Sequence, residues 1–297
     1  MTDYEAVPAG DERFEHGEGP VWDPVRARLL WVDLVAGRLL EGELTADGER
    51  VEVTRRRQFD KMVTVVVPAA AGGLLVGGQE SLFTLDADGT RRDGPRIVPA
   101  GARRRLNDGA TDPAGRFLVG TMSLDVESTT EELVRLEADG RLTTLDDAVT
   151  LSNGLTWSAD GRRMYHADTL AGVVWIRDYD PPTGAVGARA VHLELAPEMP
   201  DGVAIDTEDH LWVALFGAGE IRRFAPDGTL VDRVRVPAPR VTSLAFGGND
   251  LGRLLITTTY YGLDDAQRRA APDSGRLCTV RVEATGAPVV PWRGVDG

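Results

Sequence analysis

The sequence predicts an all-β chain that folds as a six-bladed β-propeller. Val, Ile, Leu, Trp and Thr alternate with polar residues at a period of two, which is the pattern of half-buried strands. Groups of such strands recur about every 40–50 residues, the length of a propeller blade. No segment keeps a helical period over a comparable length.

The repeats themselves define the blades. Each contains an apolar strand, a turn with Asp and usually Gly, a second apolar strand, a Gly-containing turn and a third strand. Asp-Gly and Asn-Gly pairs supply the left-handed backbone that such turns require. Four copies are clear and two are weaker; they begin at Gly19, Gly109, Gly154 and Gly202, and at Thr64 and Ser243.

Six repeats fill the chain, so we expect residues 1–297 to form a single propeller domain. The two terminal segments are expected to complete one blade together, which closes the ring and removes exposed sheet edges. Two connections, Ser123–Glu132 and Leu263–Ser274, are longer and more polar than the others. The first of these is a candidate lid over a binding site.

Composition excludes several classes of protein. Asp and Glu number 47 against 33 Lys and Arg, a net charge of −14, whereas a duplex-binding protein needs a basic surface. No apolar run is long enough to cross a bilayer, and the first residues lack the pattern of a signal peptide. We therefore expect a cytoplasmic protein with no nucleic-acid or membrane partner; Cys278, as the only cysteine, allows no internal disulfide.

Four oxygen-bearing residues recur at one phase of the repeat. Glu18, Asn107, Asn153 and Asp201 each stand at the start of a blade's first strand, just before or near a Gly. Equivalent positions of a propeller lie in a ring about its axis, so these side chains should converge at one end of the central channel. Two carboxylates and two amides suit a hard divalent cation. The alternative is that the Asn-Gly and Asp-Gly pairs only form turns.

Other motifs carry less information. His16 with Glu18, and His166 with Asp168, have spacings that zinc ligands also use, but a hydrogen-bonded histidine is the simpler interpretation. Asp86–Gly89 is interpreted as a hairpin turn because no Glu closes an EF-hand loop. The chain has no G-x-S-x-G, Walker, H-E-x-x-H or dinucleotide motif, so nothing supports a serine triad or a nucleotide cofactor.

Five segments, in order along the chain, resemble those of a known family. They are GEGPVW, RLNDGATDPAGRFLVGTM, SNGLTWSADGRRMYHAD, PDGVAIDTEDHLWVA and TSLAFGG, spanning about Glu18 to about Thr259. They are similar to segments of the gluconolactonase, regucalcin (senescence marker protein) and luciferin-regenerating enzyme family. The resemblance implies a six-bladed propeller with one divalent metal ion, Ca²⁺ by expectation, with Mn²⁺, Mg²⁺, Zn²⁺ or Fe²⁺ as alternatives.

The resemblance also implies roles for individual residues. The family's metal ligands correspond to Glu18, Asn153 and Asp201, and its acid–base aspartate also corresponds to Asp201. Its substrate-binding Arg and Asn correspond to Arg105 and Asn107. Regucalcin-like members have a sugar-contacting Glu after the G-T-M motif, where this chain has the shorter Asp125.

These roles imply hydrolysis of a small-molecule sugar lactone. In this hypothesis the metal ion polarises the lactone carbonyl and Asp201 assists the attack of water. A calcium-binding regulatory protein and a phosphotriesterase or esterase of the same fold remain alternatives. The sequence leaves open which lactone is the substrate, which metal is native and what the oligomeric state is.

Overall fold

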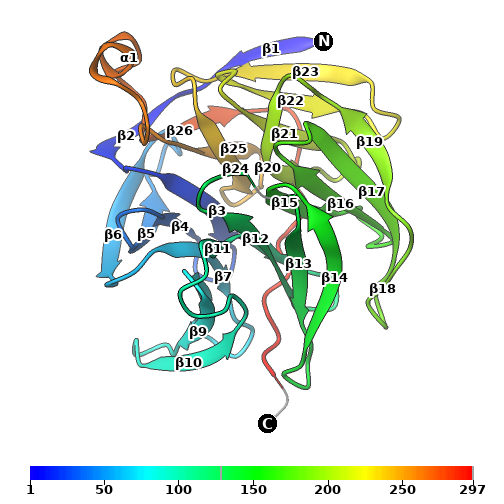
Figure 1. Cartoon of the computed structure of the whole chain (residues 1–297). Coiled ribbons are helices and arrows are strands. Elements are labelled where there is room, and N and C mark those ends of the chain that lie inside the picture. Colours follow the sequence, from blue (N-terminus) through cyan, green and yellow to red (C-terminus); the bar gives the residue numbers. More distant parts are fainter. Residues whose placement is uncertain (128, 296–297) are drawn as a thin grey trace.

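The computed structural model describes residues 1–127 and 129–295. Six sheets are arranged around a central axis as the blades of a propeller (Figure 1). One edge strand of each sheet, called its inner strand, lies nearest the axis in Figure 1; in the lists below it is named first for each blade. The predicted six-bladed β-propeller is therefore confirmed. The described residues contain one short helix, and no helix among them is long and apolar enough to span a membrane.

The first three blades follow one another along the chain, each with four strands in sequence order. They comprise β3 (Gly17–Asp23), β4 (Arg28–Asp33), β5 (Arg38–Leu44) and β6 (Val51–Gln58) in blade 1; β7 (Val63–Pro68), β8 (Leu74–Gly78), β9 (Ser81–Leu85) and β10 (Arg91–Arg96) in blade 2; and β11 (Arg104–Thr111), β12 (Phe117–Ser123), β13 (Glu131–Leu136) and β14 (Leu142–Val149) in blade 3.

The other three blades carry additional or exchanged strands. They comprise β15 (Ser152–Trp157), β16 (Arg163–Asp168), β17 (Val173–Asp180), β18 (Ala185–Val186) and β19 (Ala190–Glu194) in blade 4; β20 (Met199–Ile205), β21 (Leu211–Phe216), β22 (Glu220–Phe224), β23 (Leu230–Arg235) and β1 (Thr2–Glu5) in blade 5; and β24 (Val241–Gly247), β25 (Arg253–Thr258), β26 (Arg276–Arg281) and β2 (Val7–Arg13) in blade 6. The helix α1 (Asp265–Ala270) lies in the predicted long connection Leu263–Ser274.

The N-terminal segment closes the ring, as the sequence predicted. Strand β2 pairs antiparallel with β26, so residues from both ends of the chain build blade 6. Strand β1 continues onto blade 5 and pairs parallel with β23. Apolar clusters join neighbouring blades, and Trp31 and Trp212 are fully buried in two of them.

A β-bulge interrupts the pairing of the first two strands in every blade. The register shifts fall at one phase of the repeat, between residues 18 and 21, 63 and 65, 106 and 109, 152 and 155, 200 and 203, and 241 and 243. An extra residue in a strand bends it and re-aims a side chain. The fold therefore provides six equivalent positions, close to the axis, where a side chain departs from the regular pleat.

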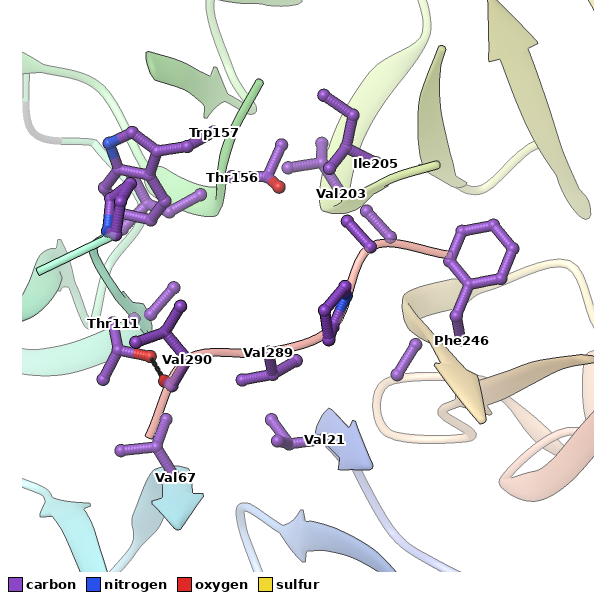
Figure 2. Close-up of a pocket in the computed structure, with 18 of the residues that line it drawn as sticks. Val21, Val67, Thr111, Thr156, Trp157, Val203, Ile205, Phe246, Val289 and Val290 are labelled. Atoms are coloured by element: carbon purple, nitrogen blue, oxygen red, sulfur yellow. Dashed lines mark hydrogen bonds between the residues drawn. The ribbon is translucent and has the colours of Figure 1, made fainter. Parts of the chain in front are cut away.

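The chain after β26 crosses the central channel at the end where the inner strands finish, opposite the end where they begin. This C-terminal strap, residues 283–295, joins blades 5 and 6 to blades 2 and 3: the N–H of Ala287 donates to the carbonyl of Ile205, and the N–H of Trp292 donates to the carbonyl of Pro68. Figure 2 shows Val289 and Val290 beside a cavity of about 720 Å³ walled largely by apolar residues of the inner strands. The strap narrows this mouth of the channel.

Removal of the strap's anchor should destabilise the ring. Trp292 is 8% exposed and packs on the apolar cluster of blades 2 and 3. We expect Trp292→Ala to lower the free energy of unfolding by about 3 kcal/mol, because a large buried side chain leaves a cavity. Chemical denaturation measures this, with Val295→Ala, an exposed position, as the control. Equal stability of the two variants would mean that the strap does not fasten the blades.

Candidate metal centre

The candidate residues lie at the β-bulges of the inner strands, either at the first residue of the register shift or within it. Glu18, Asn107, Asn153 and Asp201 are all buried, and each belongs to the first strand of a different blade. The alternative, in which the Asn-Gly and Asp-Gly pairs only form turns, is wrong for Asn153 and Asp201, which lie within β15 and β20.

The glycines that follow have a packing role. A Cβ on Gly154 would come within 2.5 Å of the backbone nitrogen of Val203, and one on Gly202 within 2.1 Å of Ser243 Oγ. Both residues therefore let neighbouring inner strands approach one another closely. This close approach brings Asn153 and Asp201, from adjacent blades, toward the same axis.

A chain of hydrogen bonds fixes the two amide side chains. Arg105 Nη1 donates to Asn107 Oδ1 at 2.6 Å, and Asn107 Nδ2 donates to Asn153 Oδ1 at 3.1 Å. Asn153 Nδ2 donates to Thr169 Oγ1 at 2.9 Å, and that hydroxyl donates to the carbonyl of Pro200 at 2.7 Å. Because the amide nitrogen of Asn153 faces Thr169, its oxygen faces Asn107. The direction of both amides is thus determined by the fold.

Negative charge is in excess at this end of the channel, where Glu18 and Asp201 are buried and Asp108 is half-buried. Glu18, Asp108 and Asp201 provide three carboxylates, and Arg105 provides one guanidinium. Burial, then Glu18 and Asp108, raises the pKa of Asp201 well above its usual value, although Arg105 opposes the shift. Burial and then Glu18 raise the pKa of Asp108 to about 7, and burial lowers the pKa of Arg105 to about 10.

These residues fit a divalent cation. Asp201 Oδ1 is buried and has no hydrogen-bond partner among the described residues. An unpaired buried carboxylate oxygen is costly, and a cation or a proton relieves the cost. Glu18 Oε2 accepts a 3.0 Å hydrogen bond from the N–H of Gly19, and Glu18 Oε1 lies 3.6 Å from His16 Nε2. The donor set contains oxygen only, which is typical of Ca²⁺ or Mg²⁺ sites.

A second group of acidic residues is an alternative cation site. Asp206, Glu208 and His210 offer ligand atoms within 4.8 Å of one another. However, Asp206 Oδ2 already accepts hydrogen bonds from Arg223 Nη2 at 2.7 Å and from Trp212 Nε1 at 3.0 Å. Glu208 is largely exposed. A cation there would have to displace the guanidinium, so the axial cluster is the better candidate.

Asp125 lies apart from the buried cluster. Its side chain is 41% exposed, accepts a hydrogen bond from Ser123 Oγ and lies 3.5 Å from Arg103 Nε. It belongs to the expected lid, Ser123–Glu132, in which Ser128 lies outside the described residues. The substrate-binding role of Asp125 therefore remains a prediction.

Four further residues belong to the site region and were not predicted from the sequence. Thr64 and Thr242 occupy the bulge positions of blades 2 and 6, where a hydroxyl replaces the amide or carboxylate. The repeat phase could have identified both. Asp108 follows Asn107 directly, but no periodic signal distinguishes it. Tyr261 is 50% exposed, and its ring centroid lies 6.0 Å from that of His16, whose Nε2 is 3.6 Å from Glu18 Oε1.

The other histidine motif has a structural role. His166 Nε2 lies 2.8 Å from Ser152 Oγ, and both residues are buried. Burial, followed by Arg177 and Arg189, lowers the pKa of His166 to about 3, so this imidazole is neutral. Asp168 accepts hydrogen bonds from the N–H groups of Thr150 and Leu151. This agrees with the interpretation of His166 as a hydrogen-bonded histidine.

Similarity to known proteins extends over nearly the whole chain. Residues 16–260 match the family model described as the SMP-30/gluconolactonase/LRE-like region. The chain is 36% identical to regucalcin from Danio rerio, with 94% of each chain covered, and 36% identical to pentonolactonase XacC from Haloferax volcanii, with 92% of each covered. Its fold is similar to that of a calcium-binding regucalcin from Agrobacterium tumefaciens, with a TM-score of 0.90, 27% identity and 99% of both chains covered.

Cation binding at this centre should depend on pH. Protons compete with a cation for Asp201 and Asp108, whose pKa values are raised in the metal-free protein. We expect the apparent affinity for Ca²⁺ to rise at least about tenfold between about pH 5.5 and about pH 8. The metal-free protein should lose stability over that range, because its folded state holds protons that the unfolded chain has already released. Calorimetry at several pH values measures both effects.

Two variants provide the controls for this measurement. Glu18→Gln should weaken binding more than about tenfold because it removes a ligand charge, whereas Glu208→Gln should leave binding unchanged. An affinity that is the same at both pH values, or that only Glu208→Gln reduces, would contradict a cation site on the axis.

Proposed function

The chain belongs to the SMP-30/gluconolactonase/LRE-like family, and on that premise we propose that it is a divalent-metal-dependent lactonase that opens a sugar lactone. The observation that carries the proposal is the unpaired, buried Asp201 Oδ1 in a cluster of excess carboxylates. The similarity to a pentonolactonase supports a sugar lactone as the substrate class.

Glu18, Asn153 and Asp201 would hold the cation. When bound, a divalent ion supplies Lewis acidity that favours negative charge on a carbonyl oxygen. The protein's contribution is a rigid donor set: the Asn153 oxygen is directed by Thr169 and Asn107, as described above. Calcium is the expected ion because it accepts carboxylate and amide oxygens in flexible numbers.

Arg105 and Asn107 would position the substrate. The Arg105 guanidinium is buried, with Nη1 held by the carbonyl of Leu106 at 2.8 Å and by Asn107 Oδ1. Its Nε and Nη2 donate to none of the side chains or carbonyls that the structure describes, so they would be available to hydroxyl groups of a sugar ring. Tyr261 and His16 form an aromatic wall beside Glu18, on which the apolar face of such a ring can pack.

Asp201 would act as the general base. Its carboxylate accepts a proton from the attacking water and returns it to the ring oxygen as the ester bond breaks. Asp and Glu carboxylates commonly serve as general bases in enzymes.

Two other functions use the same residues. A calcium-binding regulatory protein would hold the ion without turnover, and the similarity to a calcium-binding regucalcin favours this candidate next. A phosphotriesterase or esterase would accept a different electrophile in the same place. An assay of proton release from a panel of aldonolactones, with and without reconstituted metal, separates these functions. Absence of turnover with every lactone and every metal would overturn the lactonase proposal.

Substitution of Asp201 separates the base from the ligand. Asp201→Asn keeps an oxygen ligand but removes the proton acceptor, so we expect kcat to fall about 10²–10⁴-fold even at saturating metal. Steady-state rates measured across a metal titration, with occupancy followed in parallel, test this. Recovery of most of the activity at full occupancy would leave Asp201 as a ligand only.

The short, exposed side chain of Asp125 favours a tolerant substrate pocket. We expect five-carbon and six-carbon aldonolactones both to be hydrolysed, because this short, exposed carboxylate can contact only the distal hydroxyls. Asp125→Ala should change KM by less than about tenfold and leave kcat unchanged, as for loss of one exposed hydrogen bond. Rates that differ by orders of magnitude between the two lactone sizes would show that other residues determine the pocket size.

A further inference from the structure

A small basic cleft lies between blades 1 and 2, distant from the candidate metal centre. Arg26, which lines the cleft, lies in the turn between β3 and β4. Strand β3 rises about 3.3 Å per residue from Glu18 to this turn, so the cleft and the metal centre lie at opposite ends of the strand. The cleft has a volume of about 80 Å³. Its wall from blade 1 is formed by Arg26, Arg28, Glu41, Arg55 and Arg57, and its wall from blade 2 by Gly73, Leu74 and residues 85–87.

The alternation of β6 places two of these arginines together. Arg55 and Arg57 are two residues apart and therefore point to the same face of the strand. Arg56 points to the other face, where its Nη2 pairs with Glu12 of β2. The sequence Arg-Arg-Arg thus contributes two guanidinium groups to the cleft and one to an unrelated ion pair.

Two of the four cleft arginines, Arg55 and Arg57, have side chains without a hydrogen-bond acceptor among the residues that the structure describes. Arg55 Nη1 and Arg57 Nε each lie 3.9 Å from Glu41 Oε1, which is too far for a hydrogen bond. Arg57 is only 20% exposed, and its Nε is buried without a partner. Arg28, which already engages Glu41, also has a buried Nε without a partner. One glutamate therefore serves three guanidinium groups.

Charge in the cleft is opposite to that of the whole protein. Four arginines face two carboxylates, Asp23 and Glu41, while Asp86 is neutralised by Arg92 at 3.0 Å. The chain as a whole carries −14. Buried charged donors without acceptors are destabilising, so an anion that fills the cleft gains strong, charge-assisted hydrogen bonds.

We propose that this cleft binds a phosphate-type oxyanion, free or as the terminal group of a small metabolite, through Arg55 and Arg57. The planar guanidinium fork matches phosphate oxygens in pairs. Since a water-sized site needs about 10–15 Å³, the cleft has room for one group of about five heavy atoms. The ligand would also connect two blades, because Gly73 and Leu74 of blade 2 line the cleft together with Arg55 and Arg57 of blade 1.

The test compares thermal unfolding of the full chain in inorganic phosphate, a hexose 6-phosphate and chloride at matched ionic strength. Both phosphates should raise Tm above the value in chloride, as a ligand of the folded state does. Calorimetry should give a Kd at least about tenfold weaker for Arg57→Ser. Arg56→Ser is the matched control, because it removes the same charge from the opposite face of β6 and should change Kd less than about twofold.

Each outcome of this experiment decides the proposal. Tighter binding of the hexose phosphate identifies a metabolite end group, and equal binding identifies the free ion. Equal Tm in phosphate and chloride overturns the proposal, as does an equal loss of affinity in the two variants, which would indicate general charge attraction. If Arg57→Ser does not fold, Arg57→Lys keeps the charge but loses the fork, and unchanged affinity of that variant for both phosphates overturns the proposal.

Discussion

The β-bulge in the first strand of every blade is the constraint on which the rest of this structure depends. A regular strand would alternate its side chains between the two faces of the blade, toward the neighbouring blades. The bulge re-aims one residue of each inner strand toward the axis. Glycines at 154 and 202 allow the bulged strands to approach, since a Cβ there would collide with the next inner strand. Six-fold repetition then places side chains from distant parts of the sequence around one point.

That geometry has an electrostatic cost that the cluster itself does not offset. Three carboxylates are gathered with one arginine, and the raised pKa values of Asp108 and Asp201 show that burial and mutual repulsion favour their protonated forms. A divalent cation would remove the repulsion and convert the same groups into ligands. The cleft at Arg57 has the reverse imbalance, with guanidinium groups in excess of carboxylates. In both places the sign of the excess charge suggests the type of ligand: a cation at the carboxylates on the axis and an anion at the arginines of the cleft.

The sequence predicted the ring but only part of the site. Strand periodicity and repeat phase were sufficient to identify the propeller, its closure by terminal segments, and the convergence of Glu18, Asn107, Asn153 and Asp201. They could not show that Asn153 and Asp201 stand in bulges rather than turns, because Asn-Gly and Asp-Gly are typical of both. Asp108 was missed because its effect arises from burial beside Glu18, which is a three-dimensional property. The exposed position of Asp125 depends on how its loop folds against Arg103, which no periodicity encodes.

The central claim is that a cation binds on the propeller axis between the inner-strand bulges. Anomalous diffraction from crystals grown with Mn²⁺ would locate the ion directly. The account predicts one strong peak, about 2.0–2.6 Å from side-chain oxygens of Glu18, Asn153 and Asp201. A peak at Asp206, Glu208 and His210 with none on the axis would contradict it.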